Sequence, residues 1–158
     1  MSPTPDVETA TACLARSKTM LASAQILETA GDEWYAVCYF YAAYHTVRAA
    51  ILDDPLFRSL PQLAKVKDTH RLGMTMDDRY MQRHQGRIAN GTRSVGINDV
   101  VRALYPSVAV EYFQLHGASI DVRYKSGLSP ADSIAVKSSF EHVDAQYLAG
   151  ELAAPILP

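Results

Sequence analysis

The apolar residues at the start of the chain recur near steps of three and four, which is the spacing of one face of an α-helix. Thr9 or Thr11 is suited to cap this first helix, because a threonine hydroxyl can accept a hydrogen bond from a free backbone N–H of the first turn. The apolar pattern continues to about Ala30, and Gly31 then ends the helix. The sequence therefore predicts a long first helix over about 10–30.

The next segment, GDEWYAVCYFYAAYHTVRAAIL over residues 31–52, has almost no polar face. Asp32 is a good N-cap, so we expect a helix from Trp34 to about Asp53. A helix that is apolar nearly all round belongs at the centre of a bundle. The larger side chains form one stripe at helical spacing: Trp34, Cys38, Tyr41, His45, Arg48, Leu52. The smaller opposite side is free to face a partner or a second layer.

Two prolines, Pro55 and Pro61, interrupt the pattern after this helix. Residues 59–68 suit a short helix or a loop. The following segment, 69–98, is polar and contains four glycines, so we expect a short helix around 77–88 and otherwise loop.

The last third of the chain returns to helical spacing. A helix capped at position 98 or 99 is expected to run to about residue 124, with a kink or restart at Pro106. Pro130 then opens a final helix over 131–152. The chain shows no internal repeat and no run with the alternation of a strand. We therefore predict an all-α fold, an antiparallel bundle of four to five helices, forming a single domain over residues 1–158 with its core at about 10–150.

Composition agrees with one globular domain, since 48% of the 158 residues are hydrophobic and 20% are charged. His45 and Arg48 interrupt the longest apolar stretch, so no membrane span or membrane partner is expected. The start, MSPTPDVETA, lacks the features of a secretory signal, which favours a cytoplasmic location. Cys13 and Cys38 have no CxxC spacing and are interpreted as free, buried thiols.

Charge is distributed unevenly along the chain. Residues 58–93 carry eight basic and three acidic side chains, a local balance of +5, whereas the remainder carries −7. Such a split within one domain is typical of a segment that faces a polyanion, although a solvated loop with scattered charges is an equal alternative. We call residues 58–98 the basic connector.

His45 and Arg48 lie three residues apart on the most apolar helix. A buried arginine needs a carboxylate or several carbonyl groups as partners, because an unpaired buried charge costs several kcal/mol. The candidate partners are Asp53, Glu111 and Asp121. A polar anchor that fixes helix register explains the pair better than contact with a ligand.

Several short motifs resemble the HEPN superfamily over roughly residues 10–127. They are Gly31-Asp32, Ala36, Tyr39-Phe40-Tyr41-Ala42-Ala43-Tyr44-His45, Arg48-Ala49, Thr69-His70, Leu104-Tyr105 and Arg123-Tyr124. The resemblance implies a small antiparallel helical bundle that forms a homodimer. Its members range from metal-independent ribonucleases, often toxins or antiphage effectors, to inactive partners and modules that bind RNA or nucleotides. We expect a buried polar cluster of His45, Arg48, Arg123 and Tyr124.

The ribonuclease branch of that superfamily carries an arginine followed, four to six residues later, by a histidine. Arg79 and His84 match this pattern with four residues between them. Histidine can move a proton near pH 7 and arginine can stabilise charge on phosphorus, so the pair is the candidate catalytic set. Positions five apart on a helix do not share a face, so this site would need a helix end or a dimer interface. Loop charges without a catalytic role are the favoured alternative.

Other chemistries have little support in the sequence. The histidines never form HxH or HxxxH spacing, and no phosphate-binding glycine loop is present, so we expect neither a metal nor another cofactor. The favoured hypothesis is a non-catalytic HEPN-like dimer that binds nucleic acid, a nucleotide or a protein partner through the basic connector. The alternatives are a metal-independent ribonuclease, with Arg83 or Arg87 holding phosphate, and a purely structural assembly protein. The candidate nucleic-acid contacts are His70, Arg71, Arg83, Arg87 and Arg93.

Overall fold

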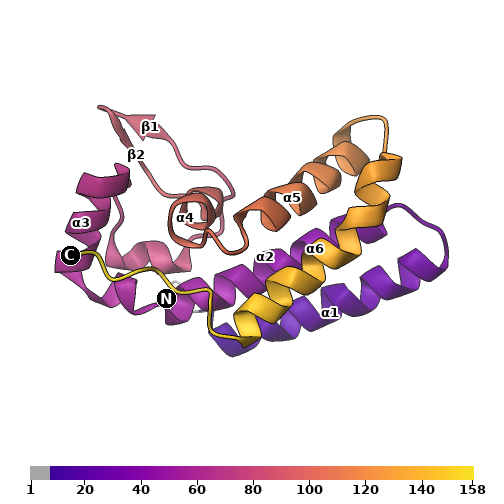
Figure 1. The fold of residues 1–158 in the computed structure, drawn as a ribbon, viewed down its shortest axis with the longest axis horizontal. Coiled ribbons are helices and arrows are strands. Elements are labelled where there is room, and N and C mark those ends of the chain that lie inside the picture. The colour runs from indigo at the N-terminus through magenta and orange to yellow at the C-terminus, as the bar shows by residue number, and fades with distance from the viewer. Residues whose placement is uncertain (1–7) are drawn as a thin grey trace, which may run out of the picture.

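The computed structural model describes residues 8–158, and this part of the chain is an all-α bundle with one very small sheet (Figure 1). Its α-helices are α1 (Ala10–Thr29), α2 (Tyr35–Asp53), α3 (Leu60–His70), α4 (Ile97–Leu104), α5 (Ala109–Tyr124) and α6 (Pro130–Leu148). Two 3₁₀ helices, η1 (Pro55–Arg58) and η2 (Met76–Tyr80), and an antiparallel pair of two-residue strands, β1 (Ile88–Ala89) and β2 (Thr92–Arg93), complete it. The predicted fold class is confirmed. Residues 1–7, on which the expectation of no signal segment depends, lie outside the described residues.

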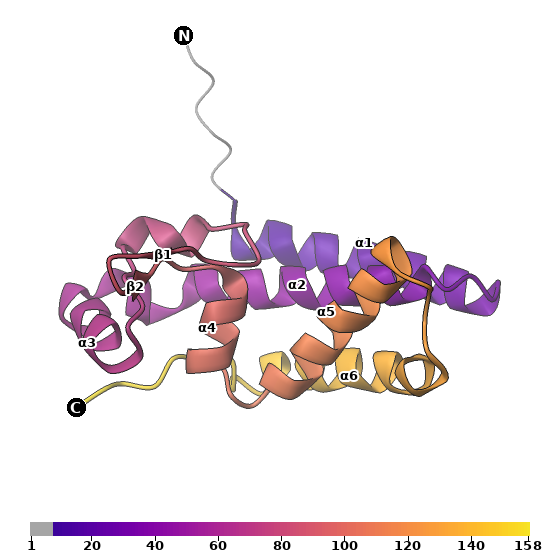
Figure 2. The same ribbon diagram turned by 90° about the horizontal axis from the view of Figure 1, so that it is seen from above.

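Helix α2 is the central helix of the bundle, as predicted. It packs against α1, α5 and α6, and Figure 2 shows α2 between α1 and α6. Of the two alternatives for the smaller side of this helix, a partner or a second layer, the structure has the second layer, since Tyr39, Ala42 and Thr46 are buried within the chain. Trp34 departs from the predicted stripe because α2 begins one residue later, and its side chain is 47% exposed.

The predicted helix boundaries around α1 and α2 depend on local capping. Thr9 Oγ1 accepts a hydrogen bond from Ala12 N at 3.1 Å and so caps α1. Gly31 follows with φ of +72°, a conformation that glycine adopts without steric cost. Asp32 Oδ1 accepts a hydrogen bond from Trp34 N at 3.0 Å, but the N-cap of α2 is Trp34 and has no side-chain cap bond, so the predicted N-cap at Asp32 is wrong.

The basic connector is more structured than expected. Residues 60–70 form α3, but the helix predicted around 77–88 is wrong beyond η2, which ends at Tyr80. The chain after η2 instead runs against the start of α4, where Ile97 N donates to Arg83 O and Asn98 N to His84 O, both at 2.9 Å. The strand pair β1–β2 also corrects the expectation that no strand would form.

The C-terminal helices follow the prolines. The predicted break at Pro106 separates α4 from α5, and Pro130 opens α6 behind Ser129. The middle of α6 packs into the core through Val136, Phe140 and Val143, whereas Ile134 and Leu148 near its ends are largely exposed.

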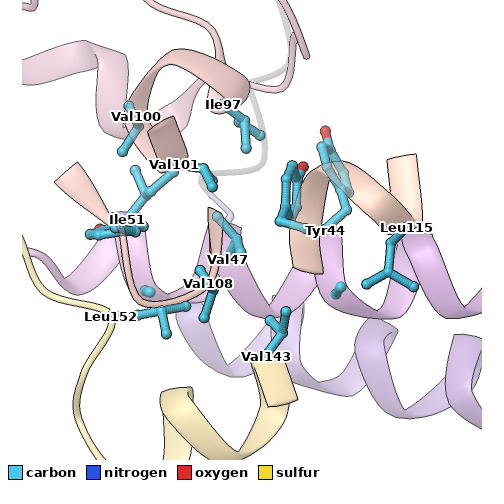
Figure 3. Close-up of a cluster of buried hydrophobic side chains, with 14 of the residues drawn as sticks. Tyr44, Val47, Ile51, Ile97, Val100, Val101, Val108, Leu115, Val143 and Leu152 are labelled. Atoms are coloured by element: carbon cyan, nitrogen blue, oxygen red, sulfur yellow. The ribbon is translucent and has the colours of Figure 1, made fainter. Parts of the chain in front are cut away.

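The core extends from the bundle of α1, α2, α5 and α6 into the end of the molecule that carries the basic connector. Figure 3 shows Ile97 and Val101 of α4 close to Val47 and Ile51 of α2, and these side chains belong to one buried cluster. The apolar face of α4 therefore belongs to the same core as the central helix. Among residues 8–158, none of the helices combines the length and apolar character needed to cross a bilayer.

Candidate functional site

Two adjoining pockets lie where the basic connector meets α4, each of about 310 Å³. The first, the hairpin pocket, is lined by His70, Arg71, Leu72, Ile88, Gly91, Arg93, Asp99, Arg102 and Ala103. The second, the loop pocket, is lined by Gln85, Gly86, Ile88, Arg93, Asn98, Asp99 and Arg102. Both pockets share Ile88, Arg93, Asp99 and Arg102, so they form one continuous concave surface. Ligand sites in proteins begin at about this size.

Asp99 organises the boundary between the two pockets. Its buried carboxylate accepts hydrogen bonds from Gly86 N at 3.1 Å and Gly96 N at 3.0 Å, and it pairs with Arg93 at 2.8 Å. Gly86 and Gly96 allow this close approach, since a Cβ at either position would lie within 2.8 Å of neighbouring backbone. The Arg93 side chain is thus held in place while 41% of its surface stays exposed.

Two more arginines add positive charge to this surface. The exposed guanidinium of Arg102 lies over the ring of Phe113, with its central carbon 4.7 Å from the ring centroid. Arg71 ends α3 in a left-handed conformation, and its carbonyl accepts a hydrogen bond from Arg93 N at 3.2 Å. Arg93 neutralises the charge of Asp99. Arg71 and Arg102 therefore give the pockets a net positive charge.

The structure brings together some of the predicted nucleic-acid contacts and separates others. His70, Arg71 and Arg93 all line the hairpin pocket. Arg83 lines neither pocket and has a structural role, since it donates to Val95 O and pairs with Asp78 at 3.2 Å. Arg87 is exposed on the loop that precedes β1.

Arg102 was missed because it lies outside the basic segment of the sequence. One feature of the sequence does point to Arg102: it lies three residues after Asp99, so both side chains fall on the same face of α4.

A second group of side chains, which we call the histidine cluster, lies beside the loop pocket. Its residues are Phe40, Tyr41 and Tyr44 of α2, His84 of the connector, and His116 and Arg123 of α5. The rings of His84 and His116 have centroids 5.2 Å apart, and His116 stacks on Phe40 at 4.8 Å. Tyr44 approaches His84 at 4.9 Å. Asn98 connects the cluster to the loop pocket, because it lines that pocket and its Nδ2 lies 3.3 Å from His116 Nδ1.

The electrostatic environment keeps both histidines neutral at pH 7. Burial, and then the charge of Arg123, lower the pKa of His84 below its ordinary value. Burial, followed by the nearby His84 and Arg123, lowers the pKa of His116 to about 4. Arg123 is oriented by its own contacts, since it donates to Tyr41 Oη at 3.2 Å and to Ser119 O at 3.3 Å. A neutral imidazole beside a fixed guanidinium can accept a proton.

The predicted catalytic pair, Arg79 and His84, is not brought together within one chain. Arg79 stacks on Tyr80 at 4.8 Å and lines a separate pocket with Glu8 and Thr9. His84 lies in the histidine cluster, where Arg123 is the neighbouring arginine.

The predicted buried polar cluster is only half right. His45 and Arg48 are buried, but Arg123 is half-buried and Tyr124 is 74% exposed because it lies at the last position of α5. The four residues therefore do not form one buried cluster.

The predicted carboxylate partners of Arg48 were also wrong. Arg48 pairs with Glu8, which precedes α1, and donates to Met81 O at 3.3 Å. Asp53 is exposed at the end of α2, whereas Asp121 pairs with Lys125 and Glu111 lies near His142. The contact with Glu8 supports the interpretation of Arg48 as an anchor.

The two cysteines are free thiols, one buried and one half-buried. Burial raises the pKa of Cys13 to about 11 and also raises that of Cys38, so neither is a ready nucleophile. Within residues 8–158, no three histidine, cysteine or acidic side chains gather in a way that could hold a metal ion.

Comparison of the chain with protein-family models, curated proteins and solved structures finds no match.

Proposed function

We propose that this chain is a HEPN-like helical module that binds RNA through the basic connector. The observation that carries the proposal is the pair of adjoining pockets in which His70, Arg71, Arg93 and Arg102 meet. These residues come from α3, the β-hairpin and α4, so folding gathers charges that are distant in the sequence. The motifs of α2 and the helical bundle support the proposed kinship, which also leads us to propose a homodimer.

Arginine suits this role because its planar guanidinium donates paired hydrogen bonds to phosphate oxygens. Arg93 and Arg102 are held by Asp99 and Phe113, so little side-chain freedom would be lost when a phosphate binds. Phosphate contacts release counterions, and the affinity should therefore fall as salt rises.

The test measures binding of a labelled single-stranded RNA by fluorescence anisotropy over a range of salt concentrations. We expect Arg71→Gln and Arg102→Gln each to weaken binding and to reduce the slope of log affinity against log salt by about 0.7. Lys125→Gln is the matched control, because it removes one positive charge at the other end of α5 and lines neither pocket. Equal effects of all three variants, or no binding by the wild type, would contradict the proposal.

A second candidate function, metal-independent RNA cleavage, is favoured by the histidine cluster beside the loop pocket. His84 is half-buried and neutral, with Arg123 close enough to lower its pKa. In this reaction His84 accepts the proton of a ribose 2′-hydroxyl and the 2′-oxygen bonds to phosphorus. The bond from phosphorus to the 5′-oxygen then breaks, and the proton passes from His84 to that oxygen. Arg123 stabilises the negative charge on the phosphate, and the products are a 2′,3′-cyclic phosphate and a 5′-hydroxyl.

Cleavage is tested with labelled RNA in excess EDTA. We expect the wild type to release cyclic-phosphate ends and His84→Gln to lower the rate by about 10²–10⁴-fold, the usual contribution of a general base. Arg79→Gln should have little effect, because Arg79 lies in a different pocket. This second function is rejected if the wild type leaves the RNA intact or if His84→Gln cuts at the wild-type rate.

A further inference from the structure

We propose that the loop pocket receives one unpaired nucleobase and selects bases that carry an exocyclic amino group, while the hairpin pocket holds the adjoining phosphate. The inference rests on the proposed RNA binding and adds sequence preference to it. Asn98 and Gln85 are the residues to which the preference is assigned.

The observation that points to a base is an unsatisfied hydrogen-bonding atom on Asn98, a residue that lines the loop pocket. Asn98 is only 6% exposed, and its amide Oδ1 is buried with no hydrogen-bond partner among the described residues. Buried amide oxygens are almost always paired, since removal from water without a partner is unfavourable. A ligand that donates a hydrogen bond at this position would supply the missing partner.

The other polar contact of the Asn98 amide is with His116, whose Nδ1 lies 3.3 Å from Asn98 Nδ2. With its proton on Nε2, the neutral His116 ring accepts at Nδ1 the hydrogen bond that Asn98 Nδ2 donates. This arrangement leaves Asn98 Oδ1, an acceptor, without a partner among the described residues.

The chemistry of the pocket wall favours a base over a second phosphate. Phosphate oxygens only accept hydrogen bonds, so they cannot satisfy Asn98 Oδ1. Adenine and cytosine each present an exocyclic amino donor beside a ring nitrogen that accepts a hydrogen bond. Uracil donates only through its ring N3–H, which lies between two carbonyl oxygens, so an acceptor such as Asn98 Oδ1 would meet an unfavourable carbonyl oxygen on either side of that donor. The amide of Gln85, exposed at the pocket wall, can pair with a neighbouring acceptor on the same base edge.

The position of the arginines fits a nucleotide that spans both pockets. Arg93 and Arg102 line the two pockets together, whereas His70 and Arg71 line only the hairpin pocket. A phosphate beside Arg71 and Arg102 would place its base towards Gln85 and Asn98. A base that is paired in a duplex has its hydrogen-bonding edge occupied, so only single-stranded RNA can be read in this way.

The experiment compares oligo(A), oligo(C) and oligo(U) of equal length by fluorescence anisotropy at one salt concentration. We expect oligo(A) and oligo(C) to bind roughly two- to tenfold more tightly than oligo(U), the range of a single net hydrogen bond. Asn98→Ala should abolish this preference while retaining the salt dependence of binding. Gln85→Ala should reduce the preference. Because Gln85 is exposed, its replacement leaves the core intact, so this variant tests the proposal even if Asn98→Ala does not fold.

The outcomes separate the two proposals. Equal affinity for the three oligonucleotides, with binding still weakened by Arg71→Gln, overturns base selection and leaves RNA binding intact. Tighter binding of oligo(U), or equal binding of a duplex, also overturns the inference. Failure of every RNA to bind refutes the proposed function itself.

Discussion

Replacing Glu8 by alanine is expected to lower the free energy of unfolding by about 3–5 kcal/mol, as is typical when one partner of a buried ion pair is removed. Arg48 is only 3% exposed, and within residues 8–158 its hydrogen-bonding contact apart from Glu8 is the carbonyl of Met81. Without Glu8, a guanidinium would remain in the core with most of its charge uncompensated. Urea unfolding at pH 7 measures the loss, and Glu141→Ala on the exposed face of α6 is the matched control.

A double variant distinguishes an unpaired charge from lost packing. If the buried charge causes the instability, adding Arg48→Met to Glu8→Ala should recover part of the lost stability, because the orphaned guanidinium is gone and an apolar side chain fills the space. If the two substitutions are simply additive, or if Glu8→Ala alone changes stability by less than about 1 kcal/mol, the pair behaves as a surface contact.

The helices of the bundle were predictable because local sequence and tertiary packing agree. The nearly uninterrupted apolar run of α2 leaves no side that prefers water, so a central position follows from the sequence alone. Thr9, Gly31 and Pro130 each act through contacts within a few residues, and such signals are readable without the fold. The HEPN-like kinship, by contrast, depends on short packing motifs and stays a prediction.

The β-hairpin was missed although its signal was local. Asn90 and Gly91 both have positive φ, as a tight hairpin turn requires, and the Asn-Gly pair is the strongest short-range sign of such a turn. The flanking strands have only two residues each, so no alternating pattern accompanies the turn.

The candidate sites could be predicted only in part, because they depend on contacts between distant segments. His70, Arg71 and Arg93 could be selected by charge, but Arg102 joins them only through the packing of α4. His84 was selected for its spacing from Arg79, whereas its neighbours His116 and Arg123 lie over 30 residues away in the sequence. Glu8 likewise reaches Arg48 across 40 positions, and no periodic pattern marks such a pair.

Acidification from pH 6.5 to 4 should destabilise the fold by several kcal/mol through two buried histidines. Burial, and then the charge of Arg48, lower the pKa of His45 to about 4, and His116 is lowered to a similar value. In the unfolded chain both rings regain an ordinary pKa near 6.5. Between these values the unfolded state binds more protons than the folded state, so stability is present above pH 6.5 and is lost as the pH falls towards 4.

Each of the two histidines contributes up to about 3 kcal/mol to this loss, since a pKa difference of one unit corresponds to 1.36 kcal/mol. His84 acts in the same direction, and Glu8 extends the loss to lower pH. Burial alone raises the pKa of the Glu8 carboxyl, but Arg48 outweighs it and lowers the pKa below its ordinary value.

Urea unfolding across this pH range measures the effect. The slope of the free energy of unfolding against pH should be clearly smaller for His45→Gln combined with His116→Gln than for the wild type. The same slope in both proteins would mean that these rings are already protonated in the folded state, and the buried, neutral environment assigned to them would then be wrong.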